Sequence, residues 1–177
     1  MRFIVIPLAL LAACASDDYQ RPRTVEYLTD AVLVPSCAAA QCHSSFARKD
    51  GYSFSTVDEA RDSIVDMVAG AIDAPDHGDP DDALFVQVLT RTVKRMPYDQ
   101  ALPDGDQELI RDFIAIGAPG AQCNPANGET QCLGLDKLIT CGDDYNFTVV
   151  EDCTLRPPTD PGNVWKCVAN ACEEFTP

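Results

Sequence analysis

The placement of nine cysteines is the feature that most constrains how this chain can fold. One lies at residue 14, two lie at residues 37 and 42, and six are confined to the last 55 residues. In an exported chain, an even set of cysteines in a short segment indicates a disulfide framework. The six cysteines that we expect to pair among themselves are Cys123, Cys132, Cys141, Cys153, Cys167 and Cys172.

The N-terminus has the order of a targeting segment. Met1-Arg2 gives a positive start, residues 3–11 are apolar, and Leu11-Ala12-Ala13-Cys14 ends the run. This resembles a bacterial lipoprotein signal peptide. The resemblance implies removal of residues 1–13, acylation of Cys14 and attachment to a membrane through that lipid. The alternative is an ordinary signal cut after a small-residue box, which leaves Cys14 incidental.

The resemblance also implies a location. The mature protein would be lipid-anchored in the bacterial cell envelope, in the periplasm or at the outer membrane, with residues 14–23 as a solvated tether. The chain carries 28 acidic and 13 basic side chains, for a net charge of −15. Such a charge repels phosphate backbones, so we expect no nucleic-acid partner.

The segment around Cys37, Cys42 and His43 has the residues that a covalent haem requires. A c-type haem needs two thiols for its vinyl groups and an adjacent imidazole for its iron, as in the Cys-x-x-Cys-His signature. Here four residues separate the thiols, and the small residues Ala38, Ala39 and Ala40 allow the extra pair to bulge out. Met96, followed by Pro97, offers a thioether as a second axial ligand.

Several segments, in order, strengthen this interpretation: Pro35-Ser36-Cys37, Cys42-His43, residues 78–84, Arg95-Met96-Pro97 and Gly117-Ala118-Pro119. The stretch from about residue 24 to 121 resembles the small c-type cytochrome domains of planctomycete-type and related bacterial exported proteins. The resemblance implies covalent haem c on Cys37 and Cys42, with His43 as proximal and Met96 as distal iron ligand. It also implies electron transfer with a redox partner protein, without catalysis.

Apolar periodicity predicts four helices in residues 24–121. Thr24 opens the first, which Pro35 ends, and Thr56 opens the second in a capping box with Glu59. The third is expected to start at Asp79-Pro80 and the last at Asp104 or Asp106. The stripes expected to face the core include Ile64, Val65, Val68 and Ile72, then Leu84, Phe85, Val88 and Leu89, then Leu109, Ile110, Phe113, Ile114 and Ile116.

We therefore predict a mostly α, cytochrome c-like domain over residues 24–121, followed by a small disulfide-rich β module over residues 122–177. Gly117–Gly120 marks the boundary, and residues 147–150 and 164–166 are strand candidates. The spacing of the tail cysteines is similar to small cysteine-rich repeats appended to exported bacterial lipoproteins. Six cysteines allow fifteen pairings, so the spacing does not determine the connectivity.

Three alternatives stay open at this point. Cys37 and Cys42 could form only a disulfide, in a non-redox binding or structural lipoprotein of the envelope. They could also join His43 and His77 around zinc or copper, and His77 could replace Met96 as distal ligand. The cluster Asp76, Asp79, Asp81 and Asp82 does not fit a calcium loop, and we expect it to be solvated.

Overall fold

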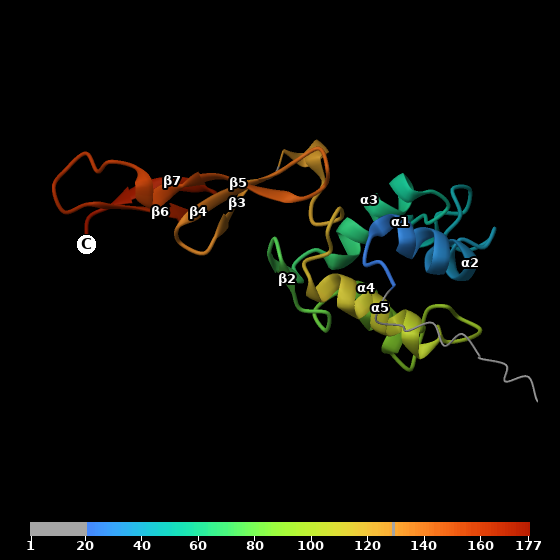
Figure 1. Ribbon diagram of the computed structural model, residues 1–177. Coiled ribbons are helices and arrows are strands. Elements are labelled where there is room, and N and C mark those ends of the chain that lie inside the picture. Colours follow the sequence, from blue (N-terminus) through green and yellow to red (C-terminus); the bar gives the residue numbers. More distant parts are fainter. Residues whose placement is uncertain (1–20, 129) are drawn as a thin grey trace, which may run out of the picture.

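The computed structural model describes residues 21–128 and 130–177. A helical body comes first along the chain, and a tail of short strands extends from one end of it (Figure 1). The body contains α1 (Val25–Leu28), α2 (Val34–Cys37), α3 (Val57–Val68), β1 (Ile72–Ala74), β2 (His77–Gly78), α4 (Leu84–Thr90) and α5 (Asp104–Ala115). The tail contains β3 (Thr130–Leu133), β4 (Lys137–Cys141), β5 (Phe147–Asp152), β6 (Val164–Val168) and β7 (Ala171–Phe175).

The predicted fold class, a mostly α cytochrome c-like domain, is wrong. The chain is 34% helix and 19% strand, its helices are short, and its strands form three small antiparallel sheets. One of these sheets, β1–β2, lies inside the region expected to be all helical. Ile72, which the periodicity placed on a helix, pairs instead with Gly78 across this hairpin.

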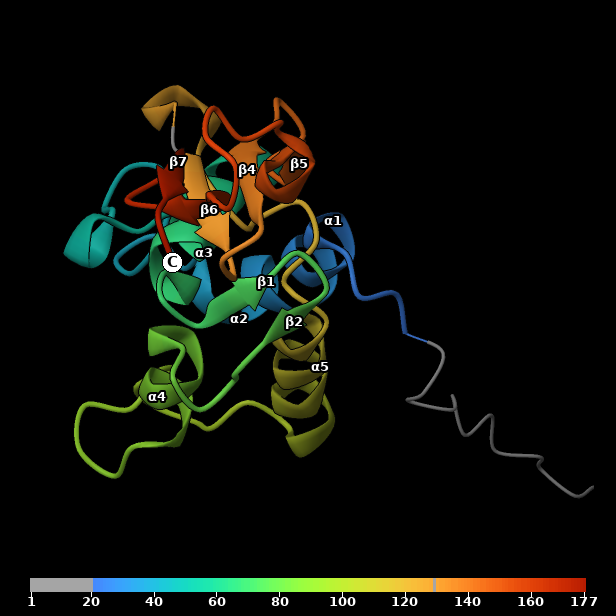
Figure 2. The same cartoon turned by 90° about the vertical axis from the view of Figure 1, so that its left-hand side faces the viewer.

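The β1–β2 hairpin forms because the chain turns once at the end of α3 and again between the two strands. Gly70 has a φ of +81°, a left-handed conformation that glycine adopts without steric penalty, so helix α3 does not continue to Ile72. Gly78 then packs so closely against the backbone of Ile114 in α5 that a side chain would collide there. Figure 2 shows the hairpin beside α5.

The first helical segment is longer than predicted. Thr24 caps it as expected, and its Oγ1 accepts a hydrogen bond from Tyr27 N at 3.2 Å. Pro35 does not end it, because a π-helical turn at Thr29–Leu33 precedes the proline and widens the helix. The helix therefore continues to Cys37, and this places the first thiol at its C-terminal end.

Two other helix predictions need correction. Asp79 does not start a helix: its side chain accepts from Asp81 N at 2.9 Å in a tight turn, and α4 begins only at Leu84. Ile116 does not face the core, since α5 ends at Ala115 and leaves Ile116 43% exposed. Thr56 does cap α3, with its Oγ1 accepting from Glu59 N at 3.3 Å.

The core of the body lies between α1, α3, α4 and α5, whose apolar faces meet. Burial of these side chains is the main favourable contribution to folding. The fully buried side chains of the body include Val25, Leu28, Val32, Leu33, Ile64, Val68, Ile110, Phe113 and Ile114.

The tail is held together by disulfides as well as by its strands. Strands β3, β4 and β5 form one antiparallel sheet, and β6 and β7 form another. All six tail cysteines pair with one another: Cys123 with Cys141, Cys132 with Cys167, and Cys153 with Cys172. The second of these bonds ties the two sheets together.

The tail is docked on the body by the turn between β4 and β5. Tyr145 in this turn donates from its hydroxyl to Asp62 at 3.1 Å, and the guanidinium of Arg61 lies 5.2 Å from its ring centroid. Asn146 Oδ1 accepts from Gly120 N at 2.6 Å. The Gly117–Gly120 segment is therefore fixed by contacts on both sides.

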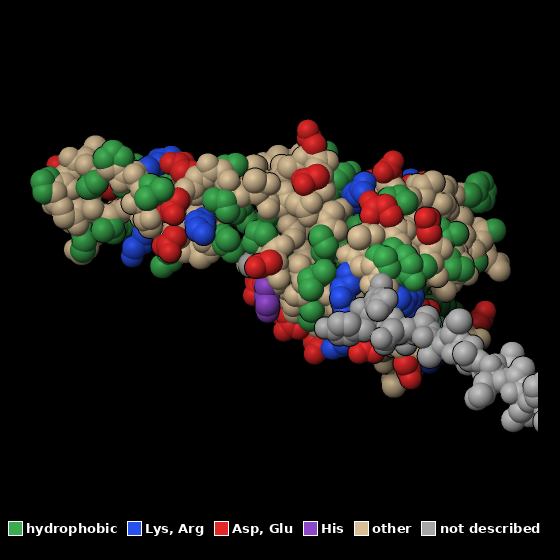
Figure 3. Space-filling model, viewed as in Figure 1, with side chains coloured by type: hydrophobic (Ala, Val, Ile, Leu, Met, Phe, Trp, Pro, Cys, Tyr) green, Lys and Arg blue, Asp and Glu red, His purple; other side chains and the backbone are tan. Residues whose placement is uncertain are grey.

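The surface agrees with the acidic composition. On the face seen in Figure 3, acidic side chains lie over both the body and the tail, and apolar side chains form separate patches. Within residues 21–128 and 130–177, no helix is both long enough and apolar enough to cross a bilayer.

Candidate functional site

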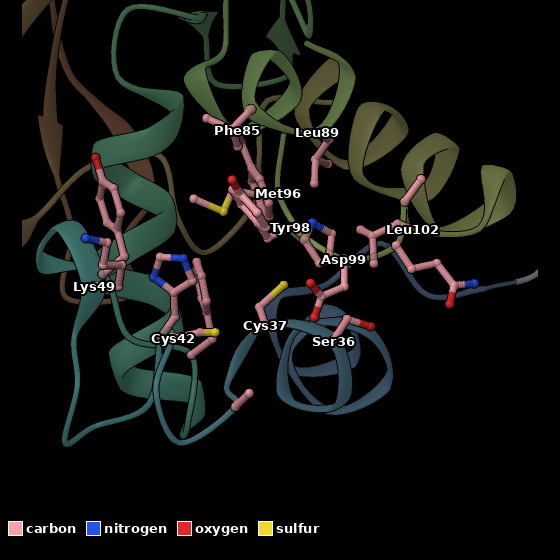
Figure 4. Close-up of a pocket in the computed structure, with 18 of the residues that line it drawn as sticks. Ser36, Cys37, Cys42, Lys49, Phe85, Leu89, Met96, Tyr98, Asp99 and Leu102 are labelled. Carbon is pink, nitrogen blue, oxygen red and sulfur yellow. The ribbon is translucent and has the colours of Figure 1, made fainter. Parts of the chain in front are cut away.

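A cavity of about 600 Å³ opens between the segment that follows α2 and the loop that joins α4 to α5. This volume lies within the range of about 300–1,000 Å³ typical of cofactor and small-molecule sites. The four residues singled out by the sequence, Cys37, Cys42, His43 and Met96, all line it. Figure 4 shows the sulfur atoms of Cys37, Cys42 and Met96 around the same hollow.

The two thiols are held by a turn that follows α2. Cys42 N donates to Ala39 O at 2.8 Å, and His43 N donates to Cys37 O at 3.2 Å. These two bonds close the four-residue spacer into a compact loop at the cavity wall. Cys37 is half-buried and Cys42 is exposed, and both are free thiols.

Burial changes the chemistry of Cys37. Removal of this thiol from water, and then its proximity to Cys42, raise the pKa of Cys37 to about 12. The charged thiolate is disfavoured in such a setting, so Cys37 stays protonated at neutral pH.

The imidazole of His43 stands between aromatic neighbours. Its ring lies edge-on to Phe54 with centroids 5.3 Å apart, and 6.4 Å from the centroid of Tyr52. His43 Nδ1 is buried and has no hydrogen-bond partner among the described residues. A buried polar nitrogen without a partner is costly, and this atom is not accessible from the cavity.

Met96 reaches the cavity from the opposite side. It belongs to the loop between α4 and α5, and its backbone N donates to Val88 O at 2.8 Å. A second thioether, that of Met67 in α3, also lines the cavity and is almost fully buried. The sequence interpretation missed Met67, although its position three residues after Ile64 places it on the predicted buried face.

The rest of the lining is mostly apolar, with polar residues at the opening. Phe54 and Phe85 stack at the inner end with centroids 6.5 Å apart. Val88, Leu89 and Leu102 continue this apolar wall. The polar lining residues are Ser36, Gln41, Lys49, Asp50, Arg91, Asp99 and Gln100.

The structure does not bring His77 to this site. His77 is exposed on the β1–β2 hairpin, where its Nδ1 lies 2.6 Å from Asp73 Oδ1, and it does not line the cavity. The hydrogen bond to Asp73 raises the pKa of His77 above its usual value. Within the described residues, no three His, Cys, Asp or Glu side chains are placed to share a metal ion. The zinc or copper arrangement with His77 therefore has no geometric support.

The side chains that do line the cavity fit a covalently bound haem. Two free thiols and an imidazole lie on one wall, and a thioether lies on the other. The apolar lining suits a porphyrin face, whereas the polar opening suits its charged edge. Cys14, the expected acylation site, lies outside the described residues.

Comparison with known proteins gives no relative: no family model, no curated protein and no solved structure matches this chain.

Proposed function

We propose that this protein is an exported, lipid-anchored electron carrier that holds a covalent haem c in the cavity between α2 and α4. The observation that carries the proposal is the convergence of Cys37, Cys42, His43 and Met96 on one cavity, although 59 positions separate Cys37 from Met96. When bound, haem would supply a one-electron redox centre.

Each residue has a distinct part in this proposal. Cys37 and Cys42 would form thioether bonds and so prevent loss of the group, and His43 and Met96 would be the axial ligands. Phe54 and Phe85 exclude water from the inner end of the cavity, and a low local dielectric helps to set the reduction potential.

The location and partners belong to the same proposal. Acylation of Cys14 would hold the protein on a membrane of the bacterial envelope, in the periplasm or at the outer membrane. Its redox partner would be another protein of that compartment. Lipid chains contribute roughly 0.8 kcal/mol per buried methylene, so two or more chains give durable anchoring.

An alternative is a non-redox binding or structural lipoprotein of the envelope, in which Cys37 and Cys42 form only a disulfide. The mostly apolar lining of the cavity supports this alternative, because such a cavity can hold an uncharged small molecule without a covalent bond.

Covalent attachment of haem distinguishes the electron carrier from the non-redox lipoprotein. The protein is expressed with a cytochrome maturation system, denatured and tested on a gel for haem peroxidase stain. We expect stain in the wild-type protein and its weakening or loss in Cys42→Ser. A wild-type protein that never carries haem under competent maturation would replace our proposal with the alternative.

A further inference from the structure

The unpaired positive charges of this acidic protein gather beside the cavity. The described arginines of the rest of the body and of the tail all make ion pairs, as with Arg21 to Asp106 at 2.7 Å and Arg111 to Asp81 at 2.6 Å. Within residues 21–128 and 130–177, seven cations have no ion pair, and five of these lie in two loops, residues 44–52 and 91–99. They are Arg48, Lys49, Arg91, Lys94 and Arg95.

These two loops, which we name the mouth loops, differ in charge from the rest of the chain. Their only acidic residues are Asp50 and Asp99, so together they carry +3, whereas the remaining sequence carries −18. Both loops line the cavity, and both lie at the end of the body away from the tail (Figure 1). Unpaired positive charge of the described residues is therefore concentrated beside the cavity.

The same loops also expose large apolar side chains. Phe46 is 96% exposed, Tyr98 is 78% exposed and Val93 is 72% exposed. Exposed aromatic and aliphatic tips between basic residues are the combination that binds an interface of anionic lipid.

The start of the described chain is close to the mouth loops. Arg21 donates to Gly105 O at 3.3 Å and to Asp106 at 2.7 Å, at the beginning of α5. The loop that carries Tyr98 runs directly into this helix through Leu102 and Pro103, which line the cavity. Cys14 precedes Arg21 by seven residues, which span at most about 25 Å.

We infer that the mouth loops are a membrane-contact surface, which turns the cavity of the anchored protein toward an anionic bilayer. The tether keeps the mouth loops near the bilayer and so raises the local concentration of lipid around them. Weak contacts are therefore enough to orient the protein. The inference rests on the lipid anchor of the proposed function but not on haem.

The test uses the single tryptophan of the chain, Trp165 in the tail. The purified acylated protein is mixed with vesicles of phosphatidylcholine, with or without phosphatidylglycerol, that contain brominated acyl chains as quenchers. In the haem-free double variant Phe46→Trp with Trp165→Phe, whose reporter lies on a mouth loop but does not line the cavity, we expect quenching in the anionic vesicles. In the wild-type protein, we expect none.

Charge reversal gives the matched comparison. Arg48→Glu with Lys94→Glu should lower the anionic-lipid-dependent quenching about tenfold, since each basic residue contributes to attraction at such a surface. Lys137→Glu with Lys166→Glu reverses the two unpaired tail cations and should leave it unchanged. Neither pair includes a residue that lines the cavity.

Other outcomes overturn the inference. Vesicle flotation and intact mass report the anchor separately from the fluorescence. A floating, acylated Phe46→Trp, Trp165→Phe variant whose fluorescence stays unquenched therefore refutes the orientation alone. A protein that does not float with anionic vesicles refutes both the anchor and the contact surface. If the mouth cations instead bind a polyglutamate peptide without any lipid contact, they belong to an acidic protein partner.

Discussion

The side-chain amide of Gln122 donates to Pro75 O at 2.5 Å, across 47 positions of sequence, and so fastens the tail to the β1–β2 hairpin. The same amide nitrogen donates to Gly117 O at 2.7 Å, and Gln122 Oε1 accepts from Phe147 N at 2.8 Å. One buried side chain therefore joins the hairpin, the end of the body and the first residue of β5.

Replacement of Gln122 by leucine should destabilise the protein by about 2–4 kcal/mol, because it leaves buried backbone groups without partners. Chemical unfolding in urea measures the change. Gln87→Leu is the control, since Gln87 also donates to two backbone oxygens, at 3.1 and 3.2 Å, but from an exposed position where water can replace it. Equal losses in the two variants would contradict the buried role of Gln122.

Removal of the bond between Cys132 and Cys167 should cost about 4 kcal/mol of stability, as expected for a closed loop of 35 residues. Since this bond links the two tail sheets, the double variant Cys132→Ser with Cys167→Ser should be cut by proteases first within the tail. Haem loading should stay at the wild-type level. Lost loading would mean that the body depends on the tail for its fold.

Local signals in the sequence predicted three of the four helix starts and were wrong for the one expected at Asp79. Thr24 and Thr56 cap helices because a side-chain oxygen beside the first turn needs no distant partner. The disulfide pairing and the β1–β2 hairpin depend on contacts between distant residues, such as Gly78 with Ile114, which periodicity does not contain. For the same reason Ile72 was assigned to a helix and is found in a strand.

The sequence predicted part of the candidate site because of the chemistry of its side chains. The chain has only two histidines and three methionines, so the adjacent Cys42-His43 pair and the later Met96 stand out, and all four predicted side chains line one cavity. Helical periodicity predicts the burial of Met67, whereas the aromatic walls and the mouth loops could not be recognised, because an exposed Phe46 and a buried Phe54 look alike in sequence. Only packing distinguishes them.

The pKa of His77 should lie above the usual value for histidine and should fall in Asp73→Asn, because the hydrogen bond to Asp73 favours the protonated ring. Titration followed by NMR measures both. A raised folded-state pKa adds stability that is fully present below the unfolded-state pKa and is lost as pH rises through the folded-state value. Because His77 is fully exposed, this contribution to stability is small. An Asp73→Asn variant with an unchanged His77 pKa would contradict the hydrogen bond between the two side chains.

In the haem-free protein, Cys42 should react with iodoacetamide much faster than Cys37 near neutral pH. Cys42 is exposed, whereas burial raises the pKa of Cys37 to about 12 and keeps that thiol protonated. Mass spectrometry of the alkylated peptides measures the two rates, with Cys42→Ser as the control that should remove the fast phase. Protection of both thiols, reversed by a reductant, would indicate the disulfide of the alternative function.

Met96 rather than Met67 should be the distal haem ligand. Both thioethers line the cavity, but Met67 is fixed in α3 within the core, whereas Met96 projects from a loop on the side of the cavity opposite the cysteines. The oxidised wild-type protein should therefore show the weak near-infrared band of sulfur-to-iron charge transfer. The band should disappear in Met96→Ala, with covalent haem retained, and persist in Met67→Leu, which conserves volume. If the band instead disappears in Met67→Leu and persists in Met96→Ala, the two methionines exchange roles, and the loop between α4 and α5 only covers the cavity.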